Sequence, residues 1–106
     1  MDKIEFYEYF INLNKCRIVQ YKAVGIKAGN GLYIADFFNA DNKQMGKSRF
    51  VRLRSFEQIQ SFRIFSFNDD LEHYKQILLN KYAEMVEHNK ANVQRQEQFL
   101  EKLKAN

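Results

Sequence analysis

The stretch CRIVQYKAVGIKAGNGLYIADFF, residues 16–38, decides the fold of this chain because it predicts a β-hairpin. Residues 16–26 are rich in the β-branched and aromatic side chains that favour strands. Gly29, Asn30 and Gly31 follow, and Asn and Gly adopt the positive φ of a tight turn at low cost. Residues 32–38 supply the return strand, so we predict two antiparallel strands joined by this turn.

The residues after this hairpin predict further strands. Residues 39–47 are polar and contain a glycine, as a loop does, and residues 48–54 read as a third strand. Ser55 and Gln58 resemble a capping box, which predicts a short helical turn through Phe56, Ile59 and Phe62. Residues 63–67 alternate as a fourth strand.

Helices are expected on both sides of this β-rich middle. Residues 2–13 place apolar side chains at helical spacing behind Asp2 and Glu5, which resemble a capping box, although a strand stays open for so short a segment. Asp69 and Glu72 form a second such box, and a long helix follows through residue 104 without Gly or Pro.

The predicted C-terminal helix is too long for the rest of the chain. Its 35 residues would span about 52 Å, whereas a body of the remaining residues is about 25–30 Å across. The helix must overhang, break near residues 88–98, or find a partner. Its apolar stripe includes Leu78, Tyr82, Leu100 and Leu103, with Asn89 as a polar position that would set register. We therefore expect a homodimer formed through this helix.

These segments define a single α+β domain over residues 1–106. It consists of a short N-terminal helix in residues 1–14, an antiparallel sheet of three to five strands in residues 15–67, and a long C-terminal helix in residues 68–104. The middle segment is basic, because residues 15–63 carry ten Lys and Arg against three Asp and Glu, whereas the whole chain has a net charge of +4. Such an asymmetry favours a polyanionic partner, either nucleic acid or an acidic protein surface.

The sequence lacks the patterns of the common catalytic and metal sites. His73 and His88 are 15 positions apart, which is too far to share a metal, and Cys16 has no conspicuous His partner nearby in the sequence. The glycines do not form a phosphate-binding loop. We therefore expect no catalytic residues, no metal and no cofactor. A single cysteine and the lack of a long apolar run favour a cytoplasmic protein without a membrane partner.

Alternation along the second and third predicted strands suggests a binding face. If Leu32, Ile34, Val51 and Leu53 point to the core, aromatic and arginine side chains share the opposite face. Such a face suits single-stranded nucleic acid, whose bases stack on rings and whose phosphates pair with guanidinium groups. The alternative is that a helix covers this face, so that the rings are core. The residues of this candidate face are Tyr33, Phe37, Phe50, Arg52 and Arg54.

At these positions the sequence resembles a WYL domain, a family with an Sm-like β-sheet. Asn30-Gly31 precedes Leu32-Tyr33-Ile34 where that family has its Trp-Tyr-Leu triad, and residues 49–56 lie in the place of a later arginine-rich strand. The likeness covers residues 16–62. It implies a regulator that senses nucleic acid or nucleotide-like ligands, with Tyr33, Arg49 and Arg52 as the ligand contacts.

A second resemblance is to the transcriptional positive-cofactor-four type of single-strand-binding domain. There, residues 46–62 match the last strand and the turn into the helix, and the helix makes a dimer. Both resemblances imply a non-catalytic regulatory protein that binds single-stranded DNA or RNA. The alternative is a small inhibitor from a phage or mobile element that binds an acidic surface of a host protein.

Overall fold

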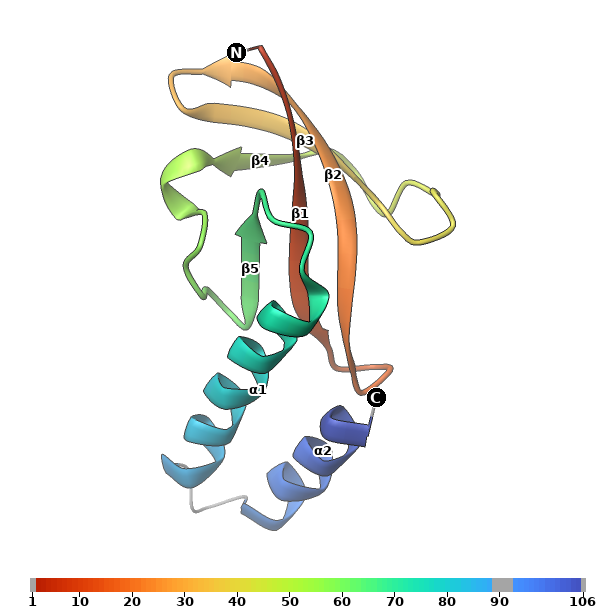
Figure 1. The fold of residues 1–106 in the computed structure, drawn as a ribbon, viewed down its shortest axis with the longest axis vertical. Coiled ribbons are helices and arrows are strands. Elements are labelled where there is room, and N and C mark those ends of the chain that lie inside the picture. Colours follow the sequence, from red (N-terminus) through yellow and green to blue (C-terminus); the bar gives the residue numbers. More distant parts are fainter. Residues whose placement is uncertain (1, 89–92, 106) are drawn as a thin grey trace.

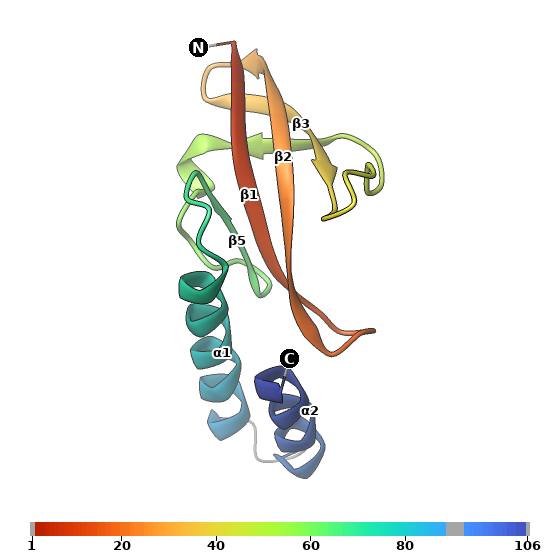
Figure 2. The same cartoon turned by 45° about the vertical axis from the view of Figure 1, so that its right-hand side comes forward.

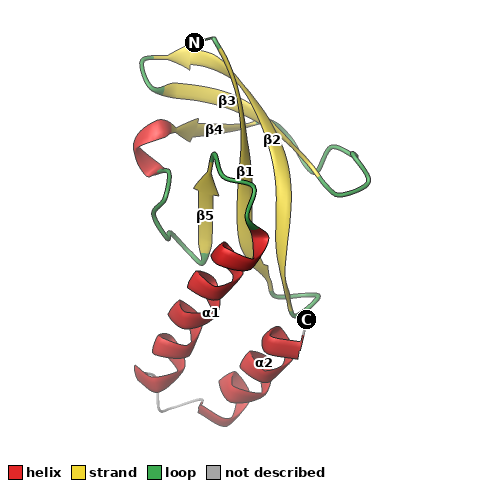
Figure 3. Cartoon of the chain, viewed as in Figure 1, coloured by secondary structure: helices red, strands yellow, loops and turns green. Residues whose placement is uncertain are grey.

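The computed structural model of this chain describes residues 2–88 and 93–105. In these residues one antiparallel sheet of five strands, in the order β4-β3-β2-β1-β5, lies at one end of the molecule and two helices lie at the other (Figures 1 and 3). The predicted α+β class is therefore confirmed. The elements are β1 (Lys3–Asn12), β2 (Arg17–Gly29), β3 (Leu32–Phe38), β4 (Arg49–Arg52), β5 (Arg63–Ser66), α1 (Leu71–His88) and α2 (Val93–Ala105), with a 3-10 helix at Leu53–Ser55.

The predicted N-terminal helix is wrong, because residues 3–12 form the strand β1. This strand pairs with β2 along its whole length and with β5 over four residues, so it lies inside the sheet. Both of its faces are covered: Ile4 and Phe6 are buried on one face, and Tyr9 and Ile11 on the other. A strand that is buried on both sides carries apolar residues at helical as well as at alternating spacing, so its sequence fits either a helix or a strand. Pairing with β2 and β5 makes residues 3–12 a strand.

The predicted hairpin is confirmed by the pairing of β2 with β3. Gly31 has a φ of +70°, which is the left-handed conformation that glycine adopts without strain. β3 then pairs with the short edge strand β4, which ends in the 3-10 helix rather than continuing through residue 54.

The expected capped helical turn after Ser55 is absent from the described residues, and the chain instead turns at Glu57, Ser61 and Phe62 with positive φ. The fourth predicted strand is confirmed as β5.

The sheet curls strongly, and the ring contacts show which face is concave. Phe37 on β3 and Phe65 on β5 have ring centroids 6.0 Å apart. Three strand spacings separate these strands, which would be about 14 Å in a flat sheet. The face that carries both rings is therefore the inside of the curl, and Figure 2 shows β3 and β4 crossing β1 and β2 at a steep angle. Its core consists of Ile4, Phe6, Ala23, Tyr33, Ala35, Phe37 and Val51.

The opposite, convex face of the sheet carries the helices over the half that contains the β1–β2 turn (Figure 1). Here Tyr9, Ile11 and Ile64 of the sheet pack against a second core formed with both helices. The sheet thus has one core on each face, displaced along the strands. The helix residues of this second core are Tyr74, Leu78, Tyr82, Val86, Leu100 and Leu103.

The long C-terminal helix is in fact two helices, α1 and α2, which pack against each other (Figure 1). The break falls in the region where the length argument allowed one, and Asn89 lies outside the described residues. Much of the predicted stripe, including Leu78, Tyr82, Leu100 and Leu103, is buried within the chain. Homodimerisation through these helices stays a prediction, but the stripe already has an intramolecular partner.

A polar network fixes the start of α1 on the sheet. The Tyr9 hydroxyl donates to the Asn68 carbonyl at 2.6 Å and accepts from the Asp70 amide at 3.0 Å, and its ring stacks on that of Tyr74 at 4.5 Å. Burial raises the pKa of the Tyr9 phenol. Asp70, rather than the predicted Asp69, caps the helix, because its Oδ1 accepts from the His73 amide at 3.2 Å.

Candidate nucleic-acid interface

The register of β3 with β4 corrects the predicted binding face. Residues directly opposite each other in an antiparallel pair share a face, and Tyr33 lies opposite Val51 while Ile34 lies opposite Phe50. Tyr33 is 5% exposed and Phe37 is fully buried, so both belong to the concave core. Placing these two rings on one open face with Phe50 was therefore wrong. The alternation of side chains along one strand does not say which of its two faces points to the core. The pairing of β3 with β4 decides which face does.

Three further predicted residues, Phe50, Arg52 and Arg54, lie on the other side of β4 or beyond it. Phe50 is 68% exposed on the convex face, opposite Ile34, and Arg52 is exposed opposite Leu32. Arg54 is exposed in the 3-10 helix. Ile26, Ile34 and Phe50 pair in a row across β2, β3 and β4, so this half of the convex face carries an exposed apolar stripe.

Arg49 points to the concave side and meets a buried carboxylate. Its Nη1 and Nη2 donate to the two oxygens of Glu8 at 3.0 and 2.6 Å, and its guanidinium lies 3.7 Å from the centroid of the Phe37 ring. Glu8 is only 1% exposed. A buried carboxylate needs such a partner, because an unpaired charge in this position would be strongly unfavourable.

Arg63 is the second cation at Glu8. Its Nε lies 2.7 Å from Oε2 of Glu8, at ion-pair distance but without hydrogen-bond geometry. Within the residues that the structure describes, the two Nη atoms of Arg63 make no hydrogen bond. Of its side chain, 42% is exposed. The cluster of two arginines and one glutamate has a net positive charge, and Arg63 presents its terminal donors to solvent.

These residues line an open groove of about 460 Å³, called here the basic groove. Phe10 and Tyr21 form one wall with their rings in an edge-to-face arrangement at 5.0 Å, and Arg63 lies 5.7 Å from the Phe10 ring. Lys47 and Ser48 from the loop before β4 add a further cation and a hydroxyl. The complete lining is Glu8, Phe10, Tyr21, Met45, Gly46, Lys47, Ser48, Arg49 and Arg63.

Most of the basic groove was missed in the sequence. Glu8 and Phe10 lay in a segment expected to be helical, and Tyr21 and Arg63 lay in predicted strands without a reason to meet. A strand assignment for residues 3–12 would have placed Glu8 in line with Ile4 and Phe6, and a lone acid on an apolar face signals a buried ion pair. Of the predicted residues, only Arg49 lines this groove.

Comparison of the chain with family models, with curated proteins and with solved structures gives no match. The two family resemblances therefore stay predictions. Within residues 2–88 and 93–105, no three His, Cys, Asp or Glu side chains are grouped so that they could hold a metal ion. Neither of the helices described is long and apolar enough to cross a membrane.

Proposed function

We propose that this chain is a non-catalytic regulatory protein that binds single-stranded DNA or RNA in the basic groove. One observation carries the proposal: a buried Glu8 holds two guanidinium groups beside two partly exposed rings at an open groove. Guanidinium groups fork onto phosphate oxygens, and a base stacked on an aromatic ring contributes about 1–3 kcal/mol.

The arrangement favours a single strand over a duplex. Phe10 and Tyr21 offer ring surface to unstacked bases, and these are accessible only in single strands. Glu8 orients both arginines in advance, so less side-chain freedom is lost when a phosphate binds. Arg63 would bind phosphate through its Nη atoms, because its Nε faces Glu8.

Binding of a labelled oligothymidylate, followed by fluorescence anisotropy across a salt series from about 50 mM, tests the proposal. Changing Lys47 and Arg63 together to Gln should lower the salt slope by about 1.4, since each phosphate contact to a single strand contributes about 0.7. Matched controls remove the same charge elsewhere: Arg52 with Arg54, and Lys102 with Lys104. Equal effects of the three double variants would mean that net charge alone attracts the strand.

The alternative function is that of a small phage or mobile-element inhibitor that binds an acidic host protein. The exposed stripe of Ile26, Ile34 and Phe50, with Arg52 beside it, favours this candidate because aromatic and arginine side chains are common at protein interfaces. If oligothymidylate does not bind even at about 50 mM salt, the nucleic-acid proposal fails and this alternative replaces it.

A further inference from the structure

The N-terminal half of β2 is a free edge of the sheet. β1 pairs with β2 from Arg17 to Ile26, whereas β3 pairs with β2 only from Lys22 onward. Among the strands that the structure describes, residues 17–21 therefore have a neighbour on one side only. In an antiparallel ladder every second residue directs its N–H and C=O to the same neighbour, so this segment presents unpaired backbone groups on its open side.

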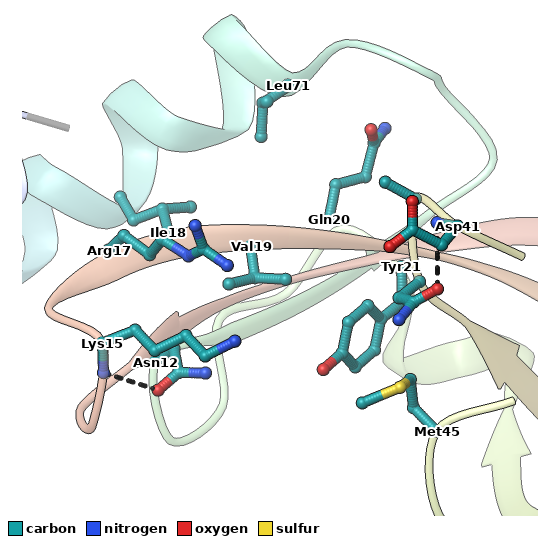
Figure 4. A pocket seen from close by; sticks show the side chains of 12 residues that line it. Asn12, Lys15, Arg17, Ile18, Val19, Gln20, Tyr21, Asp41, Met45 and Leu71 are labelled. Carbon is teal, nitrogen blue, oxygen red and sulfur yellow. Dashed lines mark hydrogen bonds between the residues drawn. The ribbon is translucent and has the colours of Figure 1, made fainter. Parts of the chain in front are cut away.

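This free edge lies in a second groove, of about 550 Å³, called here the edge groove. All five consecutive residues from Arg17 to Tyr21 line it, so the groove is open to the edge of the strand rather than to one face. Leu71 at the start of α1 forms one wall, and residues 39–41 with Met45 form the other. Figure 4 shows Gln20 and Leu71 on one side of the β2 ribbon and Tyr21 and Met45 on the other.

The edge lacks two of the devices that keep strands from pairing with other chains, a proline and a β-bulge. The chain contains no proline, and the register of β1 with β2 runs without a bulge from Arg17 to Ile26. The edge also has side-chain features that a partner strand would use. Ile18 and Val19 are half-buried on opposite faces. Lys15 and Arg17 add two cations at one end of the groove, whereas the carboxylate of Asp41 lies at the other end (Figure 4) and that of Asp69 accepts a hydrogen bond from Gln20 at 2.8 Å.

We propose that the free edge of β2, residues 17–21, binds an extended acidic segment of a partner protein as an added β-strand. Main-chain hydrogen bonds to the edge supply the attachment, as in other cases of strand addition. Carboxylates of the segment lie beside Lys15 and Arg17, and its apolar side chains contact Ile18, Val19 and Leu71. The site differs from the basic groove, although Tyr21 and Met45 line both.

Two synthetic peptides probe the site: an acetylated heptapeptide of alternating Glu and Val, and its counterpart of alternating Lys and Val. Amide hydrogen exchange of the unaltered chain is followed by NMR with each peptide at about millimolar concentration, where weak strand addition is populated. The acidic peptide should slow the exchange of alternate amides in residues 17–21, and the basic peptide should not. Absence of this protection overturns the proposal.

Charge reversal supplies the matched test. Arg17→Glu should weaken binding of the acidic peptide about fivefold, which is the size of effect expected from one nearby surface charge. The same change should strengthen binding of the basic peptide. Arg54→Glu, which lies outside the groove, should change the binding of neither peptide. Equal losses in both variants would show attraction by net charge alone and overturn the proposal.

Two other occupants would also overturn it. Protection of these amides that rises with protein concentration in the absence of peptide identifies a second copy of the chain. Protection by oligothymidylate but not by peptide identifies nucleic acid. Because the anisotropy assay reports on the basic groove separately, failure of either proposal leaves the other intact.

Discussion

Replacement of Arg49 by Ala should destabilise the protein by about 3 kcal/mol, because it removes both hydrogen bonds to a carboxylate that is 1% exposed. Loss of one partner of a buried ion pair costs about 3–5 kcal/mol. The lower end applies here because Arg63 stays 2.7 Å from Oε2 of Glu8. With a urea m-value of about 1–2 kcal/mol/M, the unfolding midpoint should fall by roughly 2 M.

A double-mutant cycle tests the reason for this loss. In Arg49→Ala combined with Glu8→Leu, the buried carboxylate is gone and an apolar side chain faces the concave core. Arg63 loses its partner, but 42% of its side chain is exposed to solvent. The double variant should therefore be about 2 kcal/mol more stable than Arg49→Ala alone. Arg52→Ala, three residues along β4 and exposed, serves as the control and should stay within about 0.5 kcal/mol of the unaltered chain. If the effects of Arg49→Ala and Glu8→Leu simply add, the carboxylate does not depend on Arg49 and the reasoning fails.

Four further outcomes are expected. Tyr74→Phe should cost about 2 kcal/mol in urea unfolding, because the hydroxyl that joins Glu57 to the fully buried Ser66 is lost. Asp70→Ala should destabilise the protein by about 1 kcal/mol in thermal melts, and Asp69→Ala should destabilise it less. The reverse order would show that Asp70 is not the cap of α1. Burial raises the pKa of Tyr9 and of Tyr82 above 10.0. The contribution of these buried phenols to the free energy of unfolding should be fully present below pH 10.0 and decline above it, because the unfolded state releases their protons first. A constant urea midpoint between pH 9 and 11 (roughly the window of the unfolded phenol) would contradict this. Light scattering should give twice the 12.7 kDa of one chain if the helices make the predicted homodimer, and a value near 12.7 kDa would dismiss it.

The sequence by itself determined the turn of the hairpin, the strand β5 and the start of α1, each of which is encoded by a few adjacent residues, although two other capping signals did not mark helices. Gly29, Asn30 and Gly31 mark the turn of the hairpin, and residues 63–66 form the strand that alternation predicts. The basic character of residues 15–63 is likewise a property of composition. The start of α1 was placed within one residue, because acidic side chains before an apolar stripe are a local signal.

Only the tertiary structure decided which side chains meet. Residues 3–12 satisfy a helix or a strand locally, and pairing with β2 and β5 makes them a strand. The same pairing turns Tyr33 and Phe37 inward and Phe50 outward. Glu8, Arg49 and Arg63 come from three different strands. Arg63 lies beside Glu8 because β5 pairs with β1, and Arg49 on β4 reaches Glu8 because the sheet curls. Curl and register depend on contacts between residues far apart in the chain, and no local pattern of side chains records them.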